Sequence, residues 1–313
     1  WESELAAQGI QHHKILDIDS KNPVTVLKLL FSIHQIIKQK GITIVHTHHR
    51  MAAFYIRLLK FVYPKLTHVY TAHNVFKDKL PLYRFALKNA KSVAVGEAVN
   101  NNLKEDVGIT DSKVIYNGVI LKETDNQVDD IVGYDGTKLG CIARLSEQKG
   151  LTYLIEAMSL LTVKNIRLFI VGDGELRNEL ENKVEELHLQ DSVTFLGYRK
   201  DIVECINSFD FLVSSSLFEG LALNVIETFM NGKTIVATDI PGINEIVNNE
   251  NGILVPAQNP GALASAIDKL ATDVPLRNRL AFHAKKTYEE RFSYSMFLEN
   301  YRALYREIQG EPK

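Results

Sequence analysis

The sequence has little of what cross-links or anchors many secreted and membrane proteins. It contains only two cysteines, Cys141 and Cys205, whose spacing matches no metal-binding or redox motif. No apolar run reaches the 18 residues that a membrane-spanning helix requires. With neither a disulfide framework nor a spanning segment, the composition favours a reduced, cytoplasmic protein.

The length and composition predict more than one folded domain. The chain has 313 residues, of which 45% are hydrophobic and 24% are charged. These fractions are ordinary for α/β proteins, and single hydrophobic cores rarely grow to serve so many residues. Two domains are therefore expected.

Charge is distributed unevenly along the chain. Residues 1–120 contain 16 Lys and Arg against 9 Asp and Glu, a net of +7, whereas the remainder has 20 against 29, a net of −9. This asymmetry indicates either an anionic partner of the first half or a solvated basic face without a partner.

Short apolar runs typical of strands alternate with amphipathic patterns typical of helices. In the first half, strands are predicted at Ile15–Ile18, Ile42–Thr47, Thr67–Ala72 and Lys91–Val95, with a helix at Val24–Lys40. In the second half, strands are predicted at Lys138–Ile142, Ile166–Val171, Val193–Leu196, Phe211–Ser214 and Thr234–Ala237, with helices at Gly150–Leu161 and Glu175–Leu187.

This alternation predicts parallel sheets built from βαβ units, and hence two Rossmann-like α/β domains facing a cleft. We expect an N-terminal domain over 1–120, an acidic linker over 121–135 and a C-terminal domain over 136–290. The last segment, 291–313, is expected to form a helix that packs back on the N-terminal domain. Ligands of such sheets bind where strands end, so the residues after each strand are the candidates for function.

The strongest motif is Ser215-Ser-Leu-Phe-Glu-Gly-Leu-Ala-Leu-Asn-Val-Ile-Glu227. A strand ends before it, Gly220 allows close backbone approach, and a following helix start offers N–H groups to a diphosphate. Glu219 and Glu227 are eight residues apart, or about 12 Å in a continuous helix. That span suits one carboxylate on a sugar and one on a ribose. By spacing alone, a surface loop glutamate and a helix-face glutamate without a ligand are the better explanation.

The Glu-x7-Glu pattern resembles that of the family 4 glycosyltransferases of the GT-B fold, group 1 type, among them enzymes of capsular and exopolysaccharide biosynthesis. Arg144-Leu-Ser-Glu-Gln-Lys-Gly150 is similar to the family's diphosphate segment. Val171-Gly-Asp-Gly-Glu-Leu176, Phe195-Leu-Gly-Tyr198 and Gly232–Glu245 follow the family's order as well. The resemblance covers nearly the whole chain.

The resemblance implies roles for the matching residues. Arg144 and Lys149 would bind the donor diphosphate and stabilise its growing charge. Glu219 would bind hydroxyls of the donor sugar and Glu227 those of the ribose.

The remaining donor contacts also follow from the resemblance. Backbone N–H groups from Gly220, Leu221 and Ala222 would assist Glu219, while Tyr198 and Arg199 would lie near the nucleobase.

His73, in Thr71-Ala-His-Asn74, matches the family's catalytic cleft histidine, which contacts the transferring sugar and the phosphate. The nearby His46, His48 and His49 could hold a metal, but no carboxylate or cysteine accompanies them at ligand spacing. Hydrogen-bonded histidines at strand ends are the simpler interpretation. No metal is expected at the active site.

The family implies a retaining transfer of a hexosyl or N-acetylhexosaminyl group from a nucleotide sugar, UDP being the commonest nucleotide. No cofactor is expected, because the nucleotide sugar is a co-substrate. The acceptor would be a glycan or a lipid-linked molecule of surface-polysaccharide assembly. A front-face route, in which the departing phosphate oxygen takes the acceptor proton, needs only positioning and charge stabilisation.

Three other functions share parts of this sequence pattern. A dinucleotide-binding reading of Gly172-Asp-Gly174 fails because Arg177 stands where the fingerprint requires glycine. A sugar-nucleotide epimerase of the same fold and an inactive sugar-nucleotide-binding protein remain alternatives. No sequence pattern points to nucleic acid.

Two further expectations concern the first half. Basic residues interleave with apolar ones in Arg50–Lys65 and recur at Lys77, Lys79, Arg84, Lys88 and Lys91, which predicts either peripheral binding to anionic membranes or ordinary core helices. The family begins with a strand and a glycine-rich loop, whereas Trp1–Gln8 resembles its first helix. We therefore expect a further strand and loop upstream in the native gene product.

Overall fold

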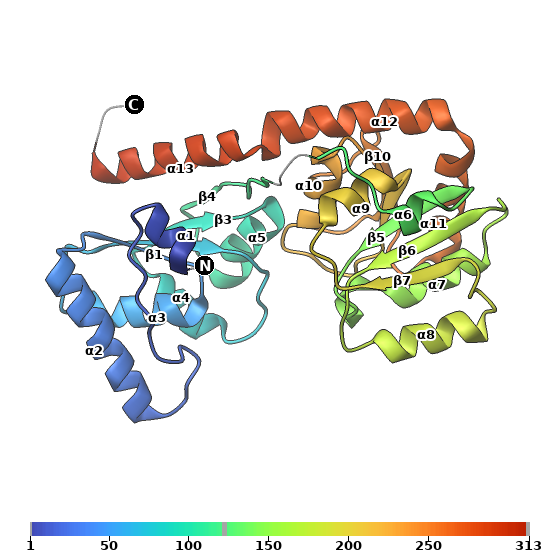
Figure 1. The fold of residues 1–313 in the computed structure, drawn as a ribbon. Coiled ribbons are helices and arrows are strands. Elements are labelled where there is room, and N and C mark those ends of the chain that lie inside the picture. The colour runs from blue at the N-terminus through green and yellow to red at the C-terminus, as the bar shows by residue number, and fades with distance from the viewer. Residues whose placement is uncertain (1, 121–123, 311–313) are drawn as a thin grey trace. The chain divides into compact units, whose positions relative to one another are not determined.

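The computed structural model describes residues 2–120 and 124–310 and divides the chain into two compact units (Figure 1). The N-terminal unit comprises residues 1–94 and 100–113, and the C-terminal unit comprises residues 95–99 and 114–313. Each unit contains one parallel sheet with helices packed against it, which confirms the predicted α/β class. The predicted domain limits, and the packing of 291–313 on the N-terminal domain, stay predictions.

The N-terminal unit has a four-stranded sheet in the order β1-β2-β3-β4. The strands are β1 (Ile44–Thr47), β2 (Thr67–Ala72), β3 (Lys91–Ala94) and β4 (Ser112–Val114). The helices are α1 (Glu2–Ala7), α2 (Pro23–Lys40), α3 (Arg50–Leu59), α4 (Leu80–Leu87), α5 (Glu97–Asn102), which crosses the unit boundary, and the π-helical turn η1 (Leu103–Val107).

Helix α2 shows how local signals set the predicted elements. The Asn22 side chain accepts a 2.9 Å hydrogen bond from the N–H of Val24, and Pro23 occupies the first turn, where its missing N–H costs nothing. The helix ends before Gly41, as predicted. Strong caps at both ends therefore made this helix predictable.

The strand predicted at Ile15–Ile18 is wrong. These residues lie in irregular structure, and the side chains of Ile15 and Leu16 are 39% and 43% exposed. A short apolar run indicates a preference for burial but does not provide the neighbouring strand that a ladder of backbone hydrogen bonds requires. In the described structure no strand pairs with this segment.

The C-terminal unit has a six-stranded sheet in the order β10-β9-β8-β5-β6-β7. The strands are β5 (Thr137–Ile142), β6 (Ile166–Val171), β7 (Val193–Gly197), β8 (Phe211–Ser214), β9 (Ile235–Thr238) and β10 (Gly252–Val255). The helices are α6 (Asp129–Val132), η2 (Glu147–Lys149), α7 (Leu151–Ser159), α8 (Arg177–Glu186), α9 (Ile202–Ser208), α10 (Leu223–Met230), α11 (Pro260–Thr272), α12 (Val274–Thr287), η3 (Tyr288–Phe292) and α13 (Tyr294–Gln309).

The strand order of this sheet fixes where a ligand binds. The chain starts at the central strand β5, adds β6 and β7 on one side, and then returns to add β8, β9 and β10 on the other. The order therefore reverses between β5 and β8, and the connections leaving these two strands diverge. Helices cover both faces of the sheet (Figure 1), so the open edge for a ligand is the carboxyl end of the strands.

The predicted linker is partly built into the C-terminal unit. Residues 121–123 lie outside the described residues, but Asp129–Val132 form helix α6, whose Ile131 is fully buried. The N–H of Val128 donates a 2.8 Å hydrogen bond to the hydroxyl of Ser208. The acidic composition of 121–135 predicted a linker. It gave no indication that Val128 and Ile131 are buried in the C-terminal unit.

The N-terminal sheet contains a buried imidazole. His68 on β2 is 1% exposed, and its Nε2 lies 2.8 Å from Oγ1 of Thr47 on the neighbouring strand. Burial, with smaller contributions from the charges of Lys60 and His46, lowers the pKa of His68 to about 4. The folded chain therefore holds this side chain neutral at pH values where an unfolded chain protonates it.

We predict that this histidine makes the protein acid-sensitive. Between the ordinary pKa of 6.5 and the folded value of about 4, the unfolded state binds the extra proton, so the free energy of unfolding falls as pH falls through this window. The loss is at most about 3 kcal/mol. His68→Gln should flatten the dependence of the melting temperature on pH between 6.5 and 4, whereas His13→Gln, at an exposed position, should leave it unchanged. Parallel curves for His68→Gln and wild type would contradict this assignment.

Candidate functional site

A cavity of about 750 Å³ opens at the carboxyl ends of the strands of the C-terminal unit. Its walls come from the segments that follow β5, β6, β7 and β8, together with the start of α10. The lining residues are Ile142, Ala143, Arg144, Lys149, Val171, Gly172, Asp173, Tyr198, Arg199, Lys200, Ile202, Glu219, Leu221, Leu223 and Asn224. Four of them are cationic and two are anionic, so the cavity favours an anion of nucleotide size.

The floor of the cavity depends on a close approach of two backbone segments. Gly172 follows β6 with φ of +138°, and a Cβ there would overlap the carbonyl oxygen of Ala143. Across the same contact, the N–H of Ala143 donates to the carbonyl of Val171 at 3.0 Å. The sequence pattern Gly-x-Gly is therefore explained by packing between the ends of β5 and β6, not by dinucleotide binding.

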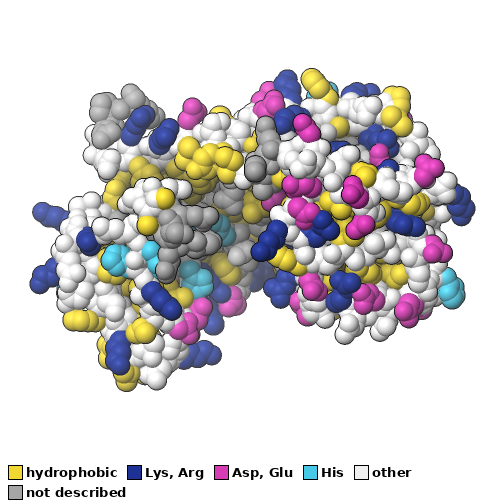
Figure 2. All heavy atoms as spheres, in the orientation of Figure 1, with side chains coloured by type: hydrophobic (Ala, Val, Ile, Leu, Met, Phe, Trp, Pro, Cys, Tyr) yellow, Lys and Arg dark blue, Asp and Glu magenta, His cyan; other side chains and the backbone are white. Residues whose placement is uncertain are grey.

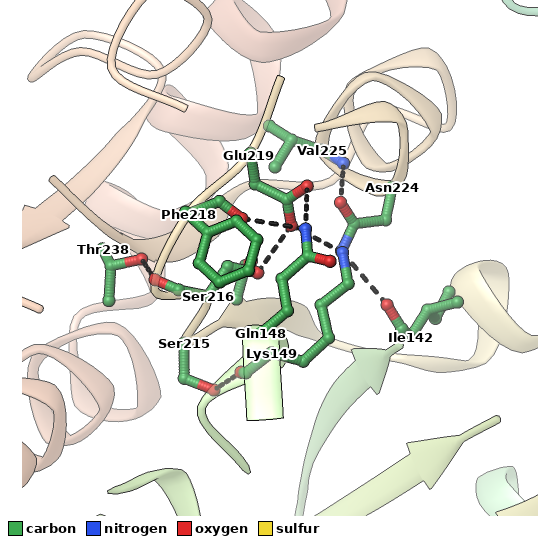
Figure 3. A network of polar contacts seen from close by, with 11 residues as sticks. Ile142, Gln148, Lys149, Ser215, Ser216, Phe218, Glu219, Asn224, Val225 and Thr238 are labelled. Carbon is green, nitrogen blue, oxygen red and sulfur yellow. Dashed lines mark hydrogen bonds and ion pairs between the residues drawn. The ribbon is translucent and has the colours of Figure 1, made fainter. Parts of the chain in front are cut away.

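A buried ion pair forms the centre of the site (Figure 3). Nζ of Lys149 lies 2.5 Å from Oε1 of Glu219, and the two side chains are 19% and 7% exposed. The same oxygen accepts a 2.8 Å hydrogen bond from the hydroxyl of Ser216, and Oε2 accepts one of 3.3 Å from Nε2 of Gln148. The carboxylate is thus held by three donors, which offset the cost of burying it.

The two segments that carry this pair are tied to each other through their backbones. The hydroxyl of Ser215 donates to the carbonyl of Lys149 at 2.8 Å, and the N–H of Leu217 donates to the carbonyl of Gln148 at 2.8 Å. Gly150 lies between them with φ of +57°, and a Cβ there would overlap the carbonyl of Ser215. In the Lys-Gly sequence, Lys149 therefore supplies the cation and Gly150 allows the two segments to pack closely.

Arg144 lines the same cavity but is held differently. Its Nη2 lies 3.1 Å from Oε2 of Glu175, and the side chains are 73% and 54% exposed. Exposed pairs of this kind contribute little to stability. Arg144 is therefore free to change partner when an anion enters the cavity.

Tyr198 and Arg199 follow β7 at the other end of the cavity. Tyr198 is 75% exposed, so its ring is available to stack on a flat ligand. Arg199 donates through Nε to Asp201 at 2.9 Å and through Nη2 to the same carboxylate, which lowers the pKa of Asp201. Arg199 is thereby oriented along the cavity wall.

Of the other residues predicted to bind the sugar donor, only some line the cavity. Leu221 lines the cavity, whereas Gly220, Ala222 and Glu227 do not. The N–H of Ala222 already donates to the carbonyl of Gly242 at 3.1 Å, so a contact from this amide to a ligand requires that bond to break. Burial raises the pKa of Glu227, and among the residues that the structure describes none donates a hydrogen bond to its carboxylate. This half-buried carboxylate is thus an acceptor in need of donors.

His73 lies in the N-terminal unit, in a cluster with two other imidazoles at the ends of β1 and β2. Nε2 of His73 lies 2.9 Å from Nδ1 of His48, and the rings of His46 and His48 stack with centroids 4.4 Å apart. Figure 2 shows histidine side chains gathered on the visible face of this unit. Desolvation lowers the pKa of all three, that of His46 to about 4.

Among the residues that the structure describes, no group of three or more His, Cys, Asp or Glu side chains is arranged to hold a metal ion. His49 turns to another partner, with its Nε2 3.8 Å from Oδ1 of Asp19. In the same described part of the chain, no helix is long and apolar enough to cross a membrane.

Sequence reasoning missed three polar residues of the site. Gln148 and Ser216 hold the carboxylate of Glu219, and Asn224 donates from Nδ2 to the carbonyl of Ile142 at 3.1 Å. Each lies next to a motif residue, but only the folded structure shows which amide or hydroxyl turns inward.

Comparison with known proteins places both halves of the chain among glycosyltransferase families. The family model of glycosyl transferases group 1 matches residues 132–287, and that of glycosyltransferase family 4 matches residues 1–123. The glycosyltransferase MJ1607 of Methanocaldococcus jannaschii, itself uncharacterized, is 31% identical over 216 residues, which are 63% of this chain and 55% of that protein. The chain thus spans about half the length of this relative.

Solved structures confirm the predicted GT-B fold. A glycosyltransferase from Rickettsia africae is 26% identical with a TM-score of 0.83, and the match covers 98% of this chain and 87% of that one. Anabaena HepE in complex with UDP is 21% identical with a TM-score of 0.85, covering 97% and 88% of the two chains. At 21% identity the second likeness concerns the fold alone.

We predict that Gly150 is essential for the packing of the site. Gly150→Ala adds a Cβ against the carbonyl of Ser215 and should destabilise the C-terminal unit by about 1–3 kcal/mol more than Gly232→Ala. Gly232 is a matched control, because its φ is +64° and a Cβ there meets nothing within 4 Å. Chemical denaturation measures both. Equal losses would show that backbone conformation alone, not the contact with Ser215, requires glycine.

Proposed function

The chain belongs to the glycosyltransferases of group 1 and family 4, and on that basis we propose that it transfers a sugar from a nucleotide-sugar donor bound in the cavity of the C-terminal unit. The observation that carries this proposal is the buried Lys149–Glu219 pair at the cavity wall. It places a cation and a hydroxyl-binding carboxylate side by side, as the junction of a diphosphate and a sugar requires.

The proposed donor is a UDP-sugar carrying a hexosyl or N-acetylhexosaminyl group. A cavity of about 750 Å³ accommodates such a molecule, and Tyr198 offers a ring for the nucleobase. The amides of Gly220 and Leu221 lie where the loop turns into α10, which suits the sugar or the diphosphate. Glu227 would accept the ribose hydroxyls, which would supply the donors that its buried carboxylate lacks.

The proposed reaction retains the configuration of the sugar and needs no metal ion. Lys149 and Arg144 would stabilise the charge that develops on the diphosphate as the bond to the sugar breaks. The departing phosphate oxygen would take the proton of the acceptor hydroxyl on the same face of the sugar. His73 would contact the transferring sugar, and burial lowers the pKa of its imidazole, which favours the neutral form.

Transfer should depend on Arg144 and not on divalent metal. With UDP-glucose, UDP-N-acetylglucosamine and related donors, we expect transfer or slow donor hydrolysis by mass spectrometry, unchanged by EDTA. Arg144→Gln should lower the rate roughly 100-fold, because one charge contact to the transition state is lost. Its melting temperature should stay unchanged, because this side chain is 73% exposed.

Arg279→Gln, at an exposed position on α12 outside the cavity, is the matched control and should leave the rate unchanged. Epimer formation without transfer would replace the proposal with an epimerase. Complete loss with EDTA that Mn²⁺ restores would contradict the metal-independent mechanism.

The proposed acceptor is a glycan or lipid-linked molecule of surface-polysaccharide assembly, reached from the cytoplasmic face of the membrane. Part of the surface considered for membrane binding belongs to the core, because Ala53, Tyr55, Ile56 and Leu59 of α3 are buried. Phe61 and Val62 remain 69% and 62% exposed directly after it. Arg57 lies over the rings of Phe61 and Phe85, at 5.0 and 5.4 Å, so basic and apolar groups share this surface.

Binding to anionic vesicles should therefore require Phe61 and Val62. In flotation with vesicles containing phosphatidylglycerol, wild-type protein should float at low salt and sink at high salt, because surface charges are screened. Phe61→Ser with Val62→Ser should abolish flotation. Phe282→Ser, at a 68% exposed phenylalanine of the C-terminal unit, is the control and should float. Failure of the wild type to float at low salt would end the membrane proposal.

A further inference from the structure

The carboxylate of Glu219 has almost no free acceptor capacity. A carboxylate offers about four acceptor sites, two on each oxygen. Oε1 accepts from Nζ of Lys149 at 2.5 Å and from the hydroxyl of Ser216 at 2.8 Å, which fills both of its sites. Oε2 accepts from Gln148 at 3.3 Å. One site on Oε2 is left.

Gln148 is held so that it can supply this bond. Its Nε2 carries two hydrogens, and the second donor direction is used by the carbonyl of Phe218 at 2.9 Å. Both acceptors belong to the same loop, so the amide spans consecutive residues of that loop (Figure 3). The amide therefore fixes the loop backbone and the rotation of the Glu219 side chain together.

The remaining donors are rigid as well. Ser216 is 1% exposed, and its carbonyl accepts a 2.6 Å hydrogen bond from the hydroxyl of Thr238 on β9. Lys149 is anchored through its own carbonyl by Ser215. A ligand hydroxyl cannot displace such donors without leaving a buried polar group unpaired, at roughly 1–3 kcal/mol for each group.

We propose that Gln148 is a positioning residue that leaves Glu219 a single acceptor site, so that this carboxylate reads one hydroxyl of the donor sugar. The inference rests on the proposed function, in which Glu219 faces that sugar. Gln148 itself does not line the cavity, so it acts through Glu219. Without the amide, Oε2 loses the bond that fixes its direction, and the carboxylate can turn away from that hydroxyl.

The test compares UDP, UDP-glucose and the four UDP-glucose analogues that lack the 2-, 3-, 4- or 6-hydroxyl, by calorimetry. Gln148→Met keeps the length of the side chain and removes both hydrogen bonds. It should leave UDP affinity within about twofold and weaken UDP-glucose at least about tenfold. The affinity penalty of one missing hydroxyl, and of one only, should shrink in this variant.

Two further variants separate positioning from a general structural effect. Gln148→His can donate through Nε2 and should restore the wild-type preference. Gln127→Met removes a similar amide, which donates to the carbonyl of Asn207 at 3.1 Å away from the cavity, and should behave as wild type.

Equal weakening of UDP and UDP-glucose by Gln148→Met would overturn the inference, because that is the signature of a merely structural role. So would unchanged binding of UDP-glucose, or two hydroxyl positions that respond to the variant together. Absence of UDP binding to the wild-type chain would instead contradict the proposed function itself.

Discussion

The buried pair of Lys149 and Glu219 is the interaction on which the rest of the site depends. Two ionised side chains that are 19% and 7% exposed pay a large desolvation cost, which a single 2.5 Å contact rarely recovers. The additional donors from Ser216 and Gln148 are therefore required, and each constrains its own segment. To bring these side chains together, the segments around Lys149 and Ser215 must lie in backbone contact. That contact requires glycine at position 150 and is held by the hydrogen bond from Ser215 to the carbonyl of Lys149.

Strand order determines which residues can take part. The order in which the chain adds strands reverses between the parallel neighbours β5 and β8, so the loop after β5 that carries Lys149 and the loop after β8 that carries Glu219 diverge from adjacent strands. The cavity lies between these loops, and its walls are held in place by the sheet. Because the strands hold the ends of these loops, few additional side-chain contacts are needed to fix the site. Hydrogen bonds from Gln148 and Ser216 orient the carboxylate of Glu219.

Much of this arrangement could be predicted from the sequence, but for different reasons at different places. Buried strands such as β6 and β8 were located to the residue because apolar runs bounded by polar turns leave little choice of register. Ile15–Ile18 is a similar apolar run, but the strand predicted there does not form, since a strand also needs a neighbouring strand to pair with. Lys149 and Glu219 were found through a motif, whereas Gln148 was not. Its amide acts across 71 residues of sequence, and no spacing rule reports a contact that the tertiary fold alone creates.

Two of the four cations that line the cavity, Lys149 and Arg144, are held in opposite ways, and the difference follows from burial. Lys149 is paired with Glu219 inside the protein, so in the proposed function an arriving diphosphate would meet a cation that is already fixed in position. Arg144 is 73% exposed and paired with a half-exposed Glu175, a contact that costs little to break. A fixed cation supplies preorganised stabilisation without rearrangement, and a loosely held one can follow the phosphate charge as it shifts. A site that must bind a dianion and then stabilise more negative charge on it benefits from having one of each.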